Sequence, residues 1–177
     1  MCGIAGILNL NEDLVDINEL KKMTNAIRHR GPDGEGFYVD KNIGIGNRRL
    51  SIIDLSSSGT QPMISSNGRF ILSYNGEIYN FKEIRKELLS LGYKFKSQTD
   101  TEVLLYSWAE WGKKCVNLLN GMFAFSIWDK KDKTLYIVRD RYGIKPLYYA
   151  FWQKSFVFGS EQKAILEHSL SKRELDK

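Results

Sequence analysis

Four short apolar segments near the C-terminal end of the chain constrain its fold most strongly. They are residues 123–129 (FAFSIWD), 134–140 (TLYIVRD), 146–152 (PLYYAFW) and 155–160 (SFVFGS). Each is rich in β-branched or aromatic residues and is separated from the next by a short polar turn, a pattern typical of antiparallel hairpins. Because successive residues of 123–129 are apolar, both faces of that strand must be covered. The sequence therefore predicts layered sheets with helices outside them.

Strands and helices are interspersed along the rest of the chain, which makes the fold class α+β. Further strands are predicted at 4–9, 36–40, 43–53 and 69–78, of which 36–40 and 43–53 form a pair. Helices are predicted to begin at the capping patterns Asp16-x-x-Glu19, Asn80-x-x-Glu83 and Thr99-x-x-Glu102. Gly92 and Gly112 follow the second and third helices as C-terminal caps. Short helices are expected around 114–119 and over 164–170 (AILEHSL).

Charge and hydropathy exclude several classes of partner. The chain has 177 residues and a net charge of +5, and its lysines and arginines are scattered among acidic residues. It has no basic stripe, zinc knuckle or RNA-binding aromatic signature, so no nucleic acid is expected. No apolar run approaches the ~20 residues of a membrane span, and the N-terminus lacks the features of a secretory signal. We therefore expect no membrane association and a cytoplasmic location.

The two cysteines have different contexts. They are too few for a disulfide scaffold and lack metal-ligand spacing, so no metal site is predicted. Cys115, in KKCVNLL, is expected to be an inert core residue. Removal of Met1 would leave Cys2 at the N-terminus, where its α-amine, with a pKa of about 7.7–8.0, could serve as a base for its own thiol. The alternative is that Cys2 is merely a small residue after the start codon.

Nine motifs occur in an order that identifies a family. They are MCGIAGI, RHRGPDGEG, NRRLSIIDLS, QPM, YNGEIYN, TDTEVLL, GMFAFSIWD, RDRYGIKPLYY and GSEQKAIL. With them the sequence resembles the N-terminal glutaminase domain of glutamine-hydrolysing asparagine synthetases, which are class II, N-terminal-nucleophile glutamine amidotransferases. The resemblance covers nearly the whole chain. It implies one glutaminase domain over 1–177, a four-layer αββα sandwich of two mainly antiparallel sheets, and hydrolysis of L-glutamine to glutamate and ammonia.

The resemblance also implies the catalytic residues. Cys2 would attack the glutamine side-chain amide to form a γ-glutamyl thioester. The side-chain amide of Asn75 and the backbone N–H of Gly76 would bind the oxyanion, and one such donor is typically worth about 2.7–4 kcal/mol. Asn-Gly is also a common hairpin-turn dipeptide. Here an apolar strand precedes it and a helix, not a second strand, follows, which argues against a turn.

The amino-acid head of glutamine has a second set of implied ligands. Arg49 would bind the α-carboxylate, for which a planar guanidinium is suited. Asp100, with Glu77 nearby, would bind the α-ammonium, although Asp100 at a helix start could instead be a cap. The stretch that lines the same pocket would be Leu50, Ser51, Ile52 and Ile53.

Five other charged or polar residues also carry expectations. Side chains alternate along a strand, so Arg48 should point away from Arg49 as a surface or interface cation. Arg30, in a glycine-rich loop without phosphate-loop spacing, could lie near Cys2 and lower the thiol pKa. His29 and His168 are expected on the surface, where neither would form a protease-like dyad with a cysteine. Relatives often carry histidine where Asn47 stands, and we expect little effect.

The sequence has no pyrophosphate loop of the SGGxDS type. We therefore expect an excised domain, with no cofactor of its own, whose ATP- and Mg-dependent synthetase domain is absent. The sequence does not identify the molecule that the full-length protein amidates. Aspartate is the default acceptor, and a cell-wall or surface-polysaccharide precursor is the alternative. The full-length protein could also form a homodimer, which the sequence does not decide. Two rival functions are an N-terminal-nucleophile hydrolase for another amide and a catalytically retired interaction domain. Arg49 and Asp100, which suit an amino-acid head group, argue against the first rival. The joint presence of Cys2, Arg49, Asn75, Gly76 and Asp100 argues against the second.

Overall fold

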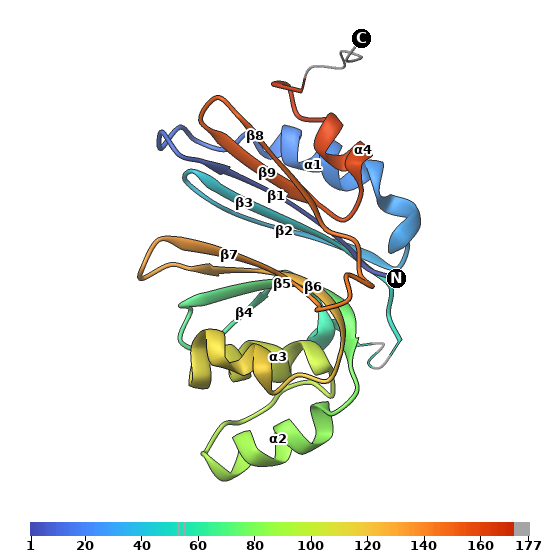
Figure 1. Ribbon diagram of the computed structural model, residues 1–177, viewed down its shortest axis with the longest axis vertical. Coiled ribbons are helices and arrows are strands. Elements are labelled where there is room, and N and C mark those ends of the chain that lie inside the picture. The colour runs from blue at the N-terminus through green and yellow to red at the C-terminus, as the bar shows by residue number, and fades with distance from the viewer. Residues whose placement is uncertain (53, 55, 172–177) are drawn as a thin grey trace.

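The computed structural model describes residues 1–52, 54 and 56–171. These residues form four layers (Figure 1). Helices α1 (Ile17–Ala26) and α4 (Gln162–Leu166) cover a five-stranded sheet, which packs against a four-stranded sheet. Helix α3 (Asp100–Trp111) covers the other face of the four-stranded sheet, and α2 (Phe81–Ser90) packs on α3. The predicted αββα sandwich is confirmed.

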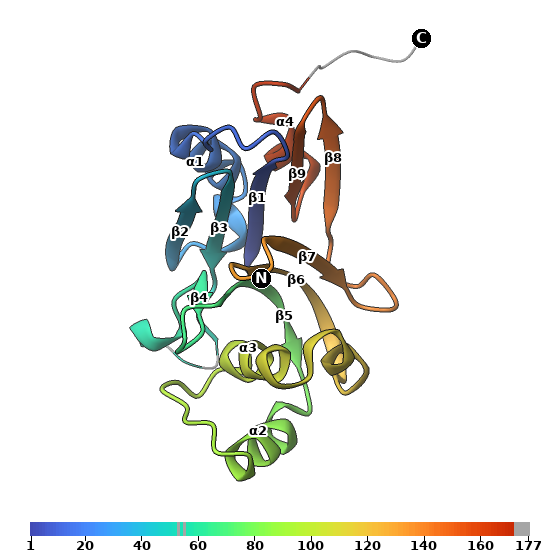
Figure 2. The same ribbon diagram turned by 90° about the vertical axis from the view of Figure 1, so that its left-hand side faces the viewer.

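The five-stranded sheet is antiparallel, with the order β2-β3-β1-β9-β8. Its strands are β1 (Gly3–Asn9), β2 (Gly34–Asp40), β3 (Ile43–Arg49), β8 (Tyr148–Trp152) and β9 (Ser155–Gly159). The first strand of the chain is therefore the central strand, between β3 and β9. This places the N-terminus between the two sheets, as both views show (Figures 1 and 2).

The four-stranded sheet has the order β4-β5-β6-β7 and is also antiparallel. Its strands are β4 (Met63–Ile64), β5 (Phe70–Ile78), β6 (Gly121–Asp129) and β7 (Thr134–Arg139). Strand β4 was not predicted, since two residues are too few to show alternation. The prediction that residues 123–129 have two apolar faces is confirmed, because Phe125 packs in the α3 cluster and Ala124 packs with Ile4 of the other sheet.

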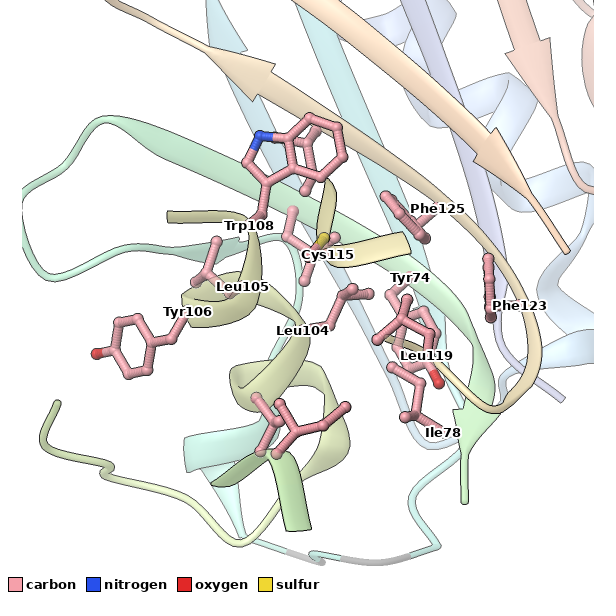
Figure 3. Close-up of a cluster of buried hydrophobic side chains, with 14 of the residues drawn as sticks. Tyr74, Ile78, Leu104, Leu105, Tyr106, Trp108, Cys115, Leu119, Phe123 and Phe125 are labelled. Carbon is pink, nitrogen blue, oxygen red and sulfur yellow. The ribbon is translucent and has the colours of Figure 1, made fainter. Parts of the chain in front are cut away.

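The largest buried cluster lies between α3 and the four-stranded sheet (Figure 3). Trp108 of α3 meets Phe125 of β6 edge to face, with ring centroids 6.1 Å apart. Cys115 belongs to this cluster, and burial raises the pKa of its thiol to about 12. The expectation that Cys115 is an inert core residue is therefore confirmed. The cluster anchors β5, and residues 74–77 of this strand line the same cavity as the N-terminal residues.

Two of the three predicted helix caps form. The Asp16 carboxylate accepts from the N–H of Asn18 at 2.8 Å, and the Thr99 hydroxyl accepts from Glu102 at 3.2 Å. Asn80 makes no cap, because its side chain bonds instead to the backbone of residues 118 and 120. Short 3₁₀ helices span Arg28–Arg30, Ser57–Gly59 and Gly112–Asn117. No helix among the described residues has the length and apolar character needed to cross a membrane.

Three other expectations about the fold are wrong. Strand β3 ends at Arg49, so 50–52 leave the sheet. Arg48 does point away from Arg49, but it is buried: its guanidinium pairs with Glu35 at 2.7 Å and bonds to Asn25 of α1. His168 is also buried, with its ring 5.7 Å from that of Trp152. A polar pattern at a chain end did not reveal that α4 folds back over the sheet.

Candidate active site

A cavity of about 210 Å³ lies beside the N-terminus. It collects segments that are far apart in the sequence: the start of the chain, the loop after β3, strand β5 and the first turn of α3. The lining residues are Met1, Cys2, Arg49, Leu50, Ser51, Ile52, Asp54, Gly59, Gln61, Tyr74, Asn75, Gly76, Glu77, Thr99, Asp100, Thr101, Met122 and Lys145. Every predicted site residue that the structure describes is among them. Ile53 lies outside the described residues.

Cys2 immediately precedes the central strand β1, and its position is held on two sides. The Sγ atom lies 3.4 Å from the backbone nitrogen of Leu50 and 3.7 Å from the Leu50 oxygen. The carbonyl oxygen of Cys2 accepts a hydrogen bond from Nε of Arg30 at 3.0 Å. Arg30 is in turn paired with Glu161 at 2.9 Å. The side chain of Cys2 is thus presented to the cavity by a fixed backbone.

The thiol of Cys2 is not acidified by its surroundings. Burial raises its pKa and outweighs the lowering effects of the Leu50 N–H, the N-terminal amine and Arg49. Arg30 lies near Cys2, as expected, but it binds the carbonyl oxygen, and the pKa of the thiol is raised overall. A thiol with a raised pKa needs a nearby base to become a nucleophile.

Asn75 and Gly76 lie inside strand β5, opposite Ala124 and Phe123 of β6. The interpretation of this dipeptide as a hairpin turn is therefore wrong. Asn75 is buried, and its Nδ2 atom has no hydrogen-bond partner. A buried donor without a partner costs free energy, about 1–3 kcal/mol, unless a ligand satisfies it. Asn75 lines the cavity, and its Nδ2 is a donor there without a partner.

Gly76 is required by the close approach of its neighbours. A Cβ atom at this position would lie 2.4 Å from the carbonyl oxygen of Met122 and 2.7 Å from the ring of Tyr74. Both distances are shorter than real Cβ contacts. Any side chain at residue 76 would therefore push β5 and β6 apart at the cavity wall.

Arg49 ends β3 and is oriented by the loop that follows it. Its guanidinium donates to the carbonyl oxygens of Ser56, at 2.8 Å, and Asp54. Gly59 makes room for it, because a Cβ there would lie 2.3 Å from an Arg49 nitrogen. A guanidinium has five N–H donors, so those not used by the loop can bind an anion.

Asp100 is the first residue of α3, and Thr99 caps that helix instead. The alternative role of Asp100 as the cap is therefore wrong. One of its oxygens, Oδ2, accepts from the Tyr74 hydroxyl at 2.8 Å and from the Ile78 N–H at 3.1 Å. Burial raises the pKa of Asp100, and these hydrogen bonds oppose the rise. The site thus contains a buried carboxylate that a cation would stabilise.

The loop after β3 forms one wall of the cavity. Leu50 and Ser51 are half-buried, and Ile52 is 75% exposed. The N–H of Ser51 donates to Asp33 at 2.8 Å, which holds the loop in place. Glu77 lines the same cavity but is exposed.

Sequence reasoning missed three lining residues that organise the site. Tyr74 orients Asp100, and the Gln61 side chain accepts from the Tyr74 N–H at 2.6 Å. Lys145 lies in the loop between β7 and β8. Tyr74 and Gln61 belong to motifs quoted above, but their residue types have no chemical signature. Asn47 is buried and donates to Gln61 at 3.3 Å, so it belongs to this same network.

The two remaining expectations concern histidine and metals. His29 is exposed, as predicted, and its side chain pairs with Glu161 at 2.9 Å. Within the part of the chain that the structure describes, no group of three or more histidine, cysteine, aspartate or glutamate side chains could hold a metal ion.

The fold is that of known amidotransferases. It matches the structure of glutamine phosphoribosylpyrophosphate (PRPP) amidotransferase from B. subtilis, complexed with ADP and GMP, with a TM-score of 0.78. The match covers 93% of this chain and 43% of that chain at 22% sequence identity. At this level of identity the likeness defines the class of fold alone.

Sequence comparisons identify the family. Asparagine synthetases [glutamine-hydrolyzing] 1 and 3 of Bacillus subtilis (strain 168) are 44% and 41% identical to this chain over 94% and 100% of its length. The chain spans 27% and 29% of those two proteins. The model of the glutamine amidotransferase domain family matches residues 1–177, and this chain belongs to that family. The predicted relationship to asparagine synthetases is confirmed.

Proposed function

We propose that this chain, once Met1 is removed, hydrolyses L-glutamine to glutamate and ammonia with Cys2 as the nucleophile. One observation carries the proposal: the thiol of Cys2 and the unpartnered Nδ2 of Asn75 line the same cavity as the Arg49 guanidinium and the buried Asp100 carboxylate. A nucleophile, an oxyanion donor and two opposite charges are the groups that a glutaminase needs.

The two charged groups suit the amino-acid head of glutamine. Arg49 retains free donors for the α-carboxylate, and Asp100 would gain a cationic partner in the α-ammonium. Glu77 supplies a second, exposed carboxylate at the same cavity. A simple amide lacks both head groups and would leave a buried charge unpaired, which favours glutamine.

The chemistry follows from the removal of Met1. The freed α-amine of Cys2 takes the thiol proton as Sγ bonds to the amide carbon, and the C=O electron pair moves onto oxygen. Asn75 Nδ2 and the Gly76 N–H stabilise that oxyanion. The ammonium then protonates the amide nitrogen, the C–N bond breaks, and ammonia leaves a γ-glutamyl thioester. Water, deprotonated by the same amine, hydrolyses the thioester to glutamate.

The rest of the proposal concerns the full-length protein. The chain spans less than a third of the two Bacillus relatives, which supports a synthetase domain as its partner. That domain would bind ATP and Mg and would consume the ammonia in an amidation, with aspartate as the default acceptor. The glutaminase domain described here would need no cofactor of its own. The free state of Cys2 and Cys115 accords with a cytoplasmic location.

The decisive experiment measures ammonia release from L-glutamine. The wild-type protein is compared with Cys2→Ala, and the intact mass of each sample establishes whether Met1 has been removed. Cys115→Ala is the matched control, because Cys115 is the other free cysteine and is buried away from the cavity.

We expect ammonia from the Met-less wild type and from Cys115→Ala, and none from Cys2→Ala. A γ-glutamyl adduct, detected as a mass increase after acid quenching, should appear on the wild type alone. A Met-less wild type that releases no ammonia, or a Cys2→Ala variant that releases it at the wild-type rate, contradicts the proposal.

A further inference from the structure

Lys145 is a buried cation at the cavity wall. It follows the turn after β7, and its side chain lines the same cavity as Cys2. Only 5% of the residue is exposed. Its backbone N–H donates to Asp140 at 3.0 Å, and its carbonyl oxygen accepts from Arg139 at 2.7 Å. The loop therefore holds Lys145 rigidly, with its side chain directed inward.

The ammonium of Lys145 has an unusual partner. Its Nζ atom donates to the thioether sulfur of Met1 at 3.2 Å, and none of the ion pairs among the described residues includes it. Burying a cation without a carboxylate partner is costly, and such costs are concentrated at functional sites. A thioether is a weak acceptor and does little to offset that cost.

The contact with Met1 places the Lys145 ammonium beside the N-terminus. The Met1 side chain joins the chain one residue before Cys2, so removal of Met1 takes away the partner of Nζ and exposes the α-amine of Cys2 nearby. Two amines then share one wall of a partly buried cavity. Like charges at short range disfavour the second charge, and a lysine amine is a stronger base than an α-amine. The α-amine therefore loses its proton first.

Other charged groups also lie near the amine. Arg49 and Asp100 act on Cys2 with opposite signs, and Glu77 and Asp54 line the cavity wall. In the complex proposed above, the glutamine head group neutralises Arg49 and Asp100. Arg30, which binds the Cys2 carbonyl, is already paired with Glu161.

We propose that Lys145 is a positioning residue that keeps the α-amine of Cys2 unprotonated at neutral pH. This inference rests on the proposed function, because it gives the N-terminal amine the role of base. A neutral amine can accept the thiol proton, and the ammonium that results is a stronger acid toward the leaving ammonia. The same charge thus increases the share of neutral amine and strengthens the acid that it becomes, without touching the substrate.

The test compares Lys145→Met, which removes the charge, with Lys145→Arg, which keeps it. Lys82→Met, at an exposed position on α2, controls for the loss of one positive charge. The pH dependence of kcat/KM for glutamine is measured on Met-less protein verified by intact mass. We expect the acidic limb of Lys145→Met to move up by about one pH unit, as a nearby like charge typically produces. Lys145→Arg and Lys82→Met should follow the wild type.

A second measurement separates this inference from the proposed function. The NMR chemical shift of the Cys2 amine nitrogen, in protein labelled at cysteine, reports amine titration whether or not the protein is active. We expect the amine of Lys145→Met to titrate at higher pH than that of the wild type. Identical titration in the two proteins overturns the inference. Absence of ammonia release from the wild type would overturn the proposed function and leave this titration as the test of Lys145.

Discussion

The phenolic oxygen of Tyr74 lies 2.8 Å from Oδ2 of Asp100, and both groups are buried at the wall of the cavity. Strand β5 supplies the donor and α3 supplies the acceptor. Burial and the Asp100 carboxylate together raise the pKa of Tyr74 well above its ordinary value, so the phenol remains a donor across the physiological range. Oδ2 of Asp100 is therefore fixed by two donors of the protein, the Tyr74 hydroxyl and the Ile78 N–H.

Tyr74→Phe should weaken the binding of glutamine. The variant removes a hydrogen bond to a charged group, typically worth about 1.5–3 kcal/mol, and leaves the Asp100 carboxylate less well oriented. We expect KM for glutamine to rise about tenfold or more, with a smaller change in kcat. Steady-state kinetics of ammonia release measure both.

Tyr93→Phe is the matched control for this prediction. The Tyr93 hydroxyl also donates to a carboxylate, that of Glu110, at 3.0 Å, but neither residue lines the cavity. Its KM should equal that of the wild type. Equal KM values for Tyr74→Phe and the wild type would show that the Tyr74 hydroxyl does not support substrate binding.

Asn75→Asp should slow the chemical step. The substitution keeps the shape of the side chain but replaces the unpartnered Nδ2 donor with an oxygen. Loss of one oxyanion donor typically lowers kcat by about 10²–10³-fold, with little change in KM. Asn18→Asp, on the exposed side of α1, is the control. A kcat for Asn75→Asp within twofold of the wild type would exclude Asn75 as an oxyanion donor.

Gly59→Ala should displace Arg49. Its new Cβ would lie 2.3 Å from an Arg49 guanidinium nitrogen, whereas the Cβ of Gly34→Ala would lie at an ordinary 3.9 Å from Arg49 Cβ. We expect KM for glutamine to rise in Gly59→Ala and to stay unchanged in Gly34→Ala. Circular dichroism and thermal melting would check that both variants fold. If the two variants have the same KM, the position of Arg49 does not limit binding.

Glu161 should make the stability of the fold depend on pH. Burial alone would raise its pKa, but hydrogen bonds from Arg30, Lys163 and His29 lower it from 4.5 to about 2. Because the folded protein holds this carboxylate ionised, its stabilising effect is complete above pH 4.5 and is lost as the pH falls toward 2.

Urea unfolding of Glu161→Gln over this pH range tests that prediction. We expect the variant to be less stable than the wild type at pH 7, with a difference that shrinks as the pH approaches 2. Glu83→Gln, on the exposed side of α2, serves as the control. A stability difference that is constant from pH 7 to the acid limit would contradict the assignment of the stabilisation to the Glu161 carboxylate.

Particular residues show how far the sequence-based expectations for the site agree with its geometry. Cys2 was predicted from its position in the chain, and Arg49 and Asp100 from the motifs around them; all three line one cavity. Arg48 and His168 show where sequence reasoning failed. Their partners, Glu35 and Glu19, are distant in the sequence, and nothing in the local pattern indicates that either side chain would be buried.

The sequence by itself determined the layers of the fold and the residue types at the site. Strands that are apolar on both faces must be covered on both sides, so the pattern of residues 123–129 dictates stacked sheets with helices outside. The tertiary structure alone decided which polar groups find partners. Tyr74 reaches Asp100, while Asn75 Nδ2 has no hydrogen-bond partner and the ammonium of Lys145 has no carboxylate in the described ion pairs. A buried polar group finds a hydrogen-bond partner only if packing brings a suitable atom within about 3 Å of it. The local sequence does not encode which atoms come that close.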